Sequence, residues 1–295
     1  VVAKRTAFSQ SFRRSDGLLE VRASAQPIAF QSEPGKFELI DTSVSETKQG
    51  LAATKNSFQV LFGDSQRGVT VVLESGERVA SRPAALDGVA PERTVQAEVD
   101  KSDDSVVWYR QVWPGVDVRY TVRSTGLSED VVFTSAPAGA GAVTFAVSGA
   151  ELDAAWLSPA PQELRSGDVA IPQGSVAASS AMTRSDLQKG STDQLGELAA
   201  VRAAAASERP AGAVPTLAAR GELAGKVRFG PVVVTTGADP VFVEDKVASP
   251  LVRSTVVAAG ESLVEVSADR GWMSSLPPAA FPVVIDPDLA IGPTW

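Results

Sequence analysis

Four aromatic residues that lie close together are the side chains of this sequence best suited to binding. Trp108, Tyr109, Trp113 and Tyr120 belong to the stretch VWYRQVWPGVDVRY, which starts at residue 107 and holds both tyrosines of the chain. Aromatic rings combine a large apolar surface with a polar edge, which suits them to contact with ligands. If the four rings shared an open sheet face, they would form a platform for a glycan.

The same stretch also fits a structural role at a turn. Proline presets φ for a turn and glycine tolerates a positive φ, so Pro114 and Gly115 predict a reversal of the chain. Trp113 would then plug the end of a β-sandwich. We favour this structural corner, formed by Trp113, Pro114, Gly115 and Asp117, because the alternating valines from residue 116 onward are typical of a core-facing strand. Asp117 would face away from that core, and its exchange for asparagine would be mild unless it anchors a turn or a cation.

Carboxylates offer the other possible chemistry. Two carboxyl groups across a cleft can hydrolyse a glycoside, and Glu129-Asp130 and Asp103-Asp104 are adjacent pairs. Adjacent residues on a strand point to opposite faces, so neither pair can act alone as such a site. The acidic run at 100–104 lacks the spacing of an EF-hand, and we expect no calcium site there.

The composition excludes several classes of function. The chain has no cysteine and no histidine, which rules out a Ser-His-Asp triad, thiolate chemistry and imidazole ligands for a metal. We therefore expect no enzyme activity, no metal site and no cofactor. The 27 Lys and Arg residues against 35 Asp and Glu give a net charge of -8, so nucleic acid is not an expected partner. No apolar run approaches the ~18 residues of a membrane-spanning helix.

Short Val-rich segments bounded by Gly, Pro or Ser predict an all-β fold. We expect one or two antiparallel β-sandwich domains. Residues 19–26 alternate between apolar and polar types and predict a half-buried strand that follows a hairpin turn at 15–17. Residues 56–83 predict a meander of three strands. The remaining predicted strands are 27–30, 36–40, 116–122, 129–133, 142–149, 227–234, 262–268 and 281–286.

One Ala-rich segment interrupts this pattern. Ser191 with Gln194 has the spacing of a helix capping box, and Pro210 would end the helix. The predicted organisation is a β-rich N-terminal domain at 1–184 and a helical or loop insertion at 185–226. Strands at 227–295 would complete the sandwich or form a second small β domain.

Three stretches resemble the N-terminal, pre-repeat region of large secreted actinobacterial proteins that carry RHS/YD repeats or DNRLRE domains. Many of these are polymorphic-toxin or cell-surface proteins. The first stretch is KRTAFSQSFRRSDGLLEVRASAQPIAFQSEPGKFELIDTSV, the second is VWPGVDVRYTVRSTGLSEDVVF, and the third is WMSSLPPAAFPVVIDPDL. The matching positions of the first stretch are Lys4, Arg5, Thr6, Phe12, Asp16, Gly17, Pro27, Ile28, Phe30, Gly35, Lys36, Phe37, Ile40 and Asp41.

The resemblance implies a secreted or cell-surface location and a non-catalytic leader module. Its partners would be the downstream regions of the same polypeptide, which it would pack against or display. A binding module for cell-envelope or host glycan is the alternative, and a carboxylate glycosidase is the third hypothesis.

Overall fold

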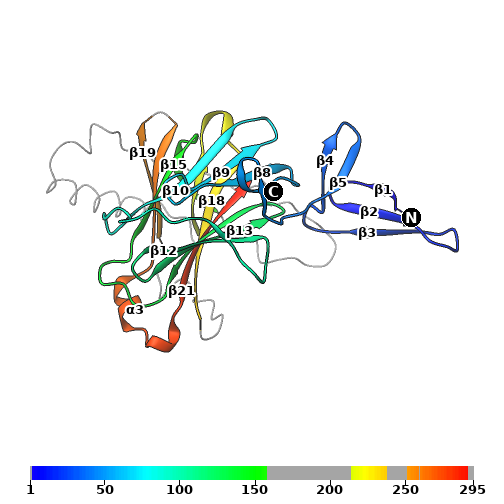
Figure 1. Cartoon of the computed structure of the whole chain (residues 1–295). Helices are drawn as coiled ribbons and strands as arrows, with labels where there is room; N and C mark the ends of the chain where they lie inside the picture. Colours follow the sequence, from blue (N-terminus) through cyan, green and yellow to red (C-terminus); the bar gives the residue numbers. More distant parts are fainter. Residues whose placement is uncertain (1, 158–213, 238–250, 259, 292–295) are drawn as a thin grey trace.

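The computed structural model describes residues 2–157, 214–237, 251–258 and 260–291. Most of these residues form antiparallel strands, and two eight-stranded sheets pack face to face around a single hydrophobic core (Figure 1). The prediction of an all-β fold is confirmed.

Sheet I is the sheet that contains the predicted meander. In spatial order its strands are β19 (Leu251–Ala258), β20 (Glu261–Ser267), β15 (Val143–Ser148), β10 (Arg78–Leu86), β9 (Val69–Leu73), β8 (Phe58–Phe62), β7 (Gly50–Ala53) and β6 (Ser45–Thr47).

Sheet II contains the aromatic stretch. In spatial order its strands are β11 (Glu98–Val99), β12 (Val106–Trp113), β13 (Val116–Arg123), β14 (Gly126–Phe133), β21 (Val283–Ile291), β18 (Val227–Thr236), β17 (Val214–Ala219) and β16 (Leu152–Leu157). Strand β19 of sheet I lies against β16 and β17 of sheet II, which closes one side of the sandwich.

The core forms because alternate residues of both sheets are apolar and point inward. In β8, Phe58, Val60 and Phe62 are at most 5% exposed, and the alternate apolar residues of β9 are buried in the same way. In β13, Val116, Val118, Tyr120 and Val122 face the same core. The strands and the inward faces predicted for these segments agree with the structure, since a period of two fixes the face of each side chain.

The C-terminal strands complete the sandwich and do not form a second domain. Strands β18 and β21 insert into sheet II next to β14, whereas β20 and β19 extend sheet I beyond β15. The last strands in sequence therefore lie near the middle of one sheet and at the edge of the other.

The insertion predicted at 185–226 ends earlier than expected. Residues 214–219 form β17, which pairs with β16 and β18, and Leu217 is fully buried. A one-turn 3-10 helix, η1 (Gly221–Leu223), follows. The part of the insertion at 185–213, with the helix expected after Ser191, lies outside the described residues.

Two short helical segments were not predicted. Helix α3 (Arg270–Ser275) begins after Asp269, whose side chain accepts a hydrogen bond from the Trp272 backbone N–H, and η2 (Pro278–Ala280) follows it. Aspartate is a preferred N-cap residue, so Asp269 is a sequence signal that could have predicted the start of α3. Across the described ranges, no helix has both the length and the apolar character needed to cross a membrane.

Residues 2–39 form two small sheets that lie to one side of the sandwich (Figure 1). One sheet has the order β1 (Val2–Arg5), β2 (Ser9–Arg13), β3 (Leu19–Ala23), and the other is the hairpin of β4 (Ala29–Glu33) and β5 (Lys36–Leu39). The hairpin predicted at 15–17 is present, and it joins β2 and β3. The half-buried strand predicted at 19–26 is wrong, because Leu19 is 59% and Val21 is 65% exposed. Alternating apolar and polar residues show that a strand has an apolar face, but whether that face is buried depends on another element packing against it.

Candidate functional site

The aromatic stretch forms the hairpin of β12 and β13. Trp113 pairs with Val116 across a two-residue turn of Pro114 and Gly115, and Gly115 has a φ of +75°. Glycine adopts this left-handed region without the steric cost that a Cβ brings. The reversal predicted for these residues is present, and it joins neighbouring strands of one sheet.

Trp113 seals the end of the core beside this turn. Its side chain is 3% exposed, and its indole Nε1 donates a 3.0 Å hydrogen bond to the carbonyl oxygen of Val89, in the loop after β10. The ring therefore has apolar contacts on its faces and a satisfied polar edge. This is the environment expected for a structural aromatic residue.

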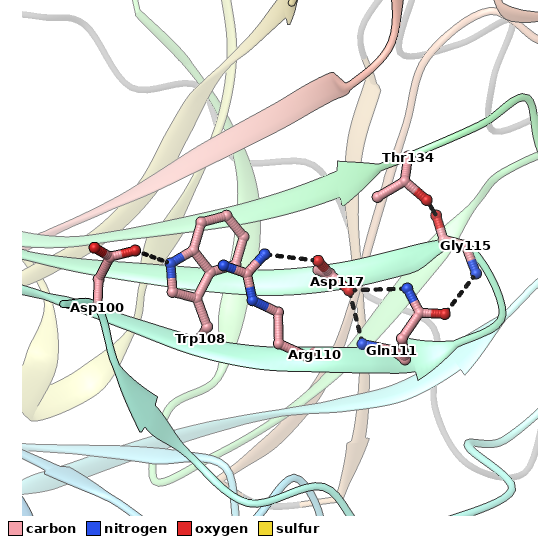
Figure 2. A network of polar contacts seen from close by, with 7 residues as sticks. All are labelled: Asp100, Trp108, Arg110, Gln111, Gly115, Asp117 and Thr134. Atoms are coloured by element: carbon pink, nitrogen blue, oxygen red, sulfur yellow. Dashed lines mark hydrogen bonds and ion pairs between the residues drawn. The ribbon is translucent and has the colours of Figure 1, made fainter. Parts of the chain in front are cut away.

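Asp117 anchors an irregular bulge in β12 (Figure 2). The register of β12 shifts between Tyr109 and Trp113, and Gln111 within this interval has a φ of +54°. The Asp117 carboxylate is buried and accepts hydrogen bonds from the Gln111 backbone N–H at 2.7 Å and from Arg110 Nη1 at 2.9 Å. A non-glycine residue at positive φ costs free energy, and Asp117 supplies the contacts that hold it there.

We expect Asp117→Ala to lower the free energy of unfolding by about 1.5 to 3 kcal/mol, the usual range for hydrogen bonds to a charged group. The loss arises because the Gln111 N–H and the Arg110 guanidinium both lose their acceptor. Urea denaturation measures it. Asp104→Ala is the matched control, since that side chain is exposed and its loss should change stability by less than about 0.5 kcal/mol. Equal effects of the two substitutions would contradict the anchoring role of Asp117.

Trp108 is the one member of the predicted platform on the outer face of sheet II, and it is half-buried there. The Arg110 guanidinium lies 3.4 Å from the centroid of its ring, and Arg119 approaches to 5.4 Å. Its Nε1 donates to Asp100 Oδ2 at 2.8 Å (Figure 2). A cation stacked this closely occupies the face that a sugar would need.

The other three platform residues lie inside the protein. Tyr109 and Tyr120 are fully buried and Trp113 nearly so. The two tyrosine rings meet edge to face with their centroids 5.7 Å apart, and the Tyr109 hydroxyl donates to the carbonyl oxygen of Gly63 at 2.9 Å. The four rings therefore do not form a platform. Tyr109, Trp113 and Tyr120 lie on the inward face of sheet II with the valines, whereas Trp108 lies on the outward face.

Glu129 is a buried carboxyl group that links the two sheets. It is 1% exposed in β14, and its Oε1 accepts hydrogen bonds from the Tyr120 hydroxyl at 2.5 Å and from the Ser81 hydroxyl of sheet I at 3.0 Å. Burial raises the pKa of Glu129 to about 7, although both hydrogen bonds act to lower it. Glu129 shares its strand face with Leu127, Val131 and Phe133, because alternate residues of a strand point to the same side. This alternation is the sequence signal that places Glu129 inside.

Neither adjacent carboxylate pair forms a two-carboxylate site. Asp130 lies on the opposite face of β14 from Glu129 and pairs with Arg119 at 2.6 Å. In the 100–104 run, Asp100 binds the Ser102 hydroxyl and the Trp108 indole, and these bonds lower the Asp100 pKa to about 2, the Ser102 bond contributing most. The Asp103 carboxylate accepts hydrogen bonds from the hydroxyl and the backbone N–H of Ser105. Among the described residues, no group of three or more acidic side chains is arranged to hold a metal ion.

A pocket of about 340 Å³ lies at the end of the sandwich beside the β9–β10 turn. Three of its charged residues have partners within the protein, and Arg220 pairs with Asp153 outside the lining. Glu77 binds Lys226 at 2.7 Å, and Glu151 accepts from the Gly260 backbone N–H at 3.1 Å. The lining residues are Glu77, Arg78, Gly149, Ala150, Glu151, Arg220, Gly221, Glu222, Leu223 and Gly260. The lining mixes acidic and basic side chains, several of them already engaged, and so favours no particular ligand.

Comparison of the chain with protein-family models, with curated proteins and with solved structures found no match.

Proposed function

We propose that this chain is a non-catalytic structural leader module of a large secreted RHS/YD-repeat-type cell-surface or toxin protein. In this role it packs against or displays the rest of its polypeptide. The observation that supports the proposal most strongly is the Ser81–Glu129–Tyr120 network, which uses a fully buried carboxyl group to join the two sheets. Glu129 accepts two hydrogen bonds inside a closed core, where it stabilises the fold and a substrate cannot reach it.

The other side chains with binding potential are used in the same way. Trp113 donates into the loop after β10, Asp117 holds the bulge of β12, and Trp108 lies beneath Arg110. The polar groups of the aromatic stretch thus bind other groups of the same chain. That pattern fits a module whose role is to be a stable unit within a longer protein.

The arrangement of the second and third stretches of resemblance also supports this proposal. The second stretch forms β13 and β14, and the third runs through α3 into β21. Strand β21 pairs directly with β14, with Val131 opposite Ile285. Segments that resemble the same family and lie far apart in the sequence are therefore neighbours in one sheet, as expected if one structural unit carries the resemblance.

The test compares two tryptophan variants within the complete natural protein that contains this sequence. If the module is a structural leader, Trp113→Ala should lower the amount of intact protein that reaches the medium or the cell surface, because it weakens the core. Trp108→Ala should leave that amount unchanged. Equal secretion and equal protease resistance of all three proteins would contradict the proposal.

A binding assay on cell-wall polysaccharide separates this proposal from the glycan alternative. We expect no retention of the isolated chain by the polysaccharide. Retention that is lost in a Trp108→Ala variant that still folds would favour a glycan-binding module instead, because Trp108 is the one platform residue on the outer face.

A further inference from the structure

Strand β3 is an edge strand with exposed apolar side chains. It ends the sheet order β1-β2-β3 and lies along the outer side of the N-terminal sheets (Figure 1). Leu19 is 59% and Val21 is 65% exposed, and Leu18 in the preceding turn is 63% exposed. A flat exposed edge with apolar side chains is a template for another strand.

The hydrogen-bond pattern of the hairpin shows which residues of β3 direct their backbone groups away from β2. The Arg14 N–H donates to the Leu18 carbonyl, and the Ser24 N–H donates to the Phe8 carbonyl, both at 2.9 Å. In an antiparallel pair, backbone groups that face the partner alternate with groups that face away. The even-numbered residues of β3 therefore face β2, and Leu19, Val21 and Ala23 direct their N–H and C=O groups outward.

The sequence of β3, Leu-Glu-Val-Arg-Ala, is complementary to itself when paired antiparallel. A two-fold axis through Val21 places Val21 opposite its copy and Leu19 opposite Ala23 of the second chain. It also places Glu20 opposite Arg22, and Arg22 opposite Glu20. Because the outward backbone bonds come from the odd-numbered residues, the Glu20–Arg22 pairs occupy non-hydrogen-bonded positions, where opposite side chains approach most closely.

We propose that two copies of this chain associate through antiparallel pairing of β3, which joins two three-stranded sheets into one of six strands. The apolar side chains of Leu19 and Val21 then form a continuous row across the junction. Within one chain Glu20 already contacts Arg22 at 2.8 Å, with the two side chains 39% and 72% exposed. The pairing gives each of these charges a second partner of opposite sign. A second copy fits this edge better than an unrelated strand because both the spacing and the sign of its charges match.

The pairing would also stabilise the small N-terminal sheet. Three short strands with an uncovered apolar face are close to the lower limit of independent stability. Extending the sheet covers backbone groups that water otherwise solvates and adds neighbours along the apolar row. This interaction goes beyond the leader role and does not depend on it.

Charge reversal tests the proposal on the complete 295-residue chain. Analytical ultracentrifugation over a concentration series should show a monomer–dimer equilibrium for the wild type. Glu20→Arg and Arg22→Glu should each raise the dimer dissociation constant about tenfold or more, because each variant places like charges opposite one another. An equimolar mixture of the two variants should recover the dimer, as should the double variant Glu20→Arg/Arg22→Glu.

Recovery in the mixture also shows that each single variant still folds its N-terminal sheet. Glu46→Arg on β6 is the matched control, since it reverses an exposed charge on an edge strand of sheet I and should leave the dimer unchanged. A monomeric wild type, single variants that dimerise as well as the wild type, or a mixture that stays monomeric would each overturn the proposal.

Discussion

Replacing Trp113 by alanine is expected to lower the free energy of unfolding by about 3 to 5 kcal/mol, the usual range for truncation of a large aromatic residue in a core. The indole is 3% exposed and closes the core at the β12–β13 turn. Its removal leaves a cavity that a rigid hairpin cannot collapse to fill. Since typical domains are stable by only about 5 to 15 kcal/mol, this loss should lower the melting temperature by roughly 10 °C.

Two further variants separate the contributions to this loss. Trp113→Phe keeps most of the apolar volume and removes the hydrogen bond to Val89, so it should cost about 1 kcal/mol. Trp108→Ala removes an aromatic residue of the same size from a half-exposed site and should cost about 1 kcal/mol, the scale of an exposed cation–π contact. Thermal denaturation of the three variants gives the comparison. A Trp113→Ala protein that melts within a degree or two of wild type would refute the structural corner.

The strands of the core could be predicted from the sequence because their apolar residues alternate and their turns carry glycine. The meander of β8, β9 and β10 and the inward face of β13 follow directly from that period. The same reasoning placed Glu129 and Asp130 on opposite faces. These features are local, and each depends on residues that are neighbours in the sequence.

The features that were not predicted depend on residues far apart in the sequence or on backbone irregularity. Strand β17 follows an Ala-rich segment and contains a proline at position 215, yet it is held by β16 and β18 on its two sides. The bulge at Gln111 adds residues to β12 without any glycine to mark it. Asp117 was expected to face away from the core, and the residues of this bulge bury it there.

Burial was the least predictable property. The apolar residues of β3 alternate as regularly as those of β8, but among the described residues a second sheet covers β8 and none covers β3. Alternation therefore predicts the direction of a side chain, whereas its exposure depends on which other elements reach that face. The same distinction applies to the aromatic platform, because three of its four rings lie on the face of sheet II that sheet I covers.

The stability of the protein should fall as the pH rises from about 5 to about 8, by an amount set largely by Glu129. Burial raises the pKa of this carboxyl group to about 7 in the folded state, against 4.5 for the group in water. Between these values the folded protein binds more protons than the unfolded chain, so the free energy of unfolding decreases with increasing pH. A difference of about 2.5 units corresponds to about 3 kcal/mol, most of it lost by pH 7.5.

Glu129→Gln should remove this dependence. At pH 5 glutamine resembles the protonated acid and can still accept from Tyr120 and Ser81, so the variant should be close to wild type in stability. At pH 8 it carries no buried charge, and it should be more stable than wild type by up to about 3 kcal/mol. Urea denaturation of both proteins at half-unit steps from pH 5 to pH 8 measures the difference.

The matched control is Glu77→Gln, which changes a carboxyl group whose pKa is lowered to about 2, chiefly by its bond to Lys226. Glu77 is ionised throughout the range from pH 5 to pH 8, so its replacement should shift the stability curve without changing its slope. Both substitutions replace a carboxyl group by an amide. They differ in that the folded protein holds a proton on Glu129 below pH 7, whereas Glu77 is ionised. A Glu129→Gln curve parallel to that of the wild type would show that Glu129 is ionised in the folded protein across this range. The Ser81 and Tyr120 hydroxyls would then be holding a carboxylate inside the sandwich, and the link between the two sheets would be a charged one.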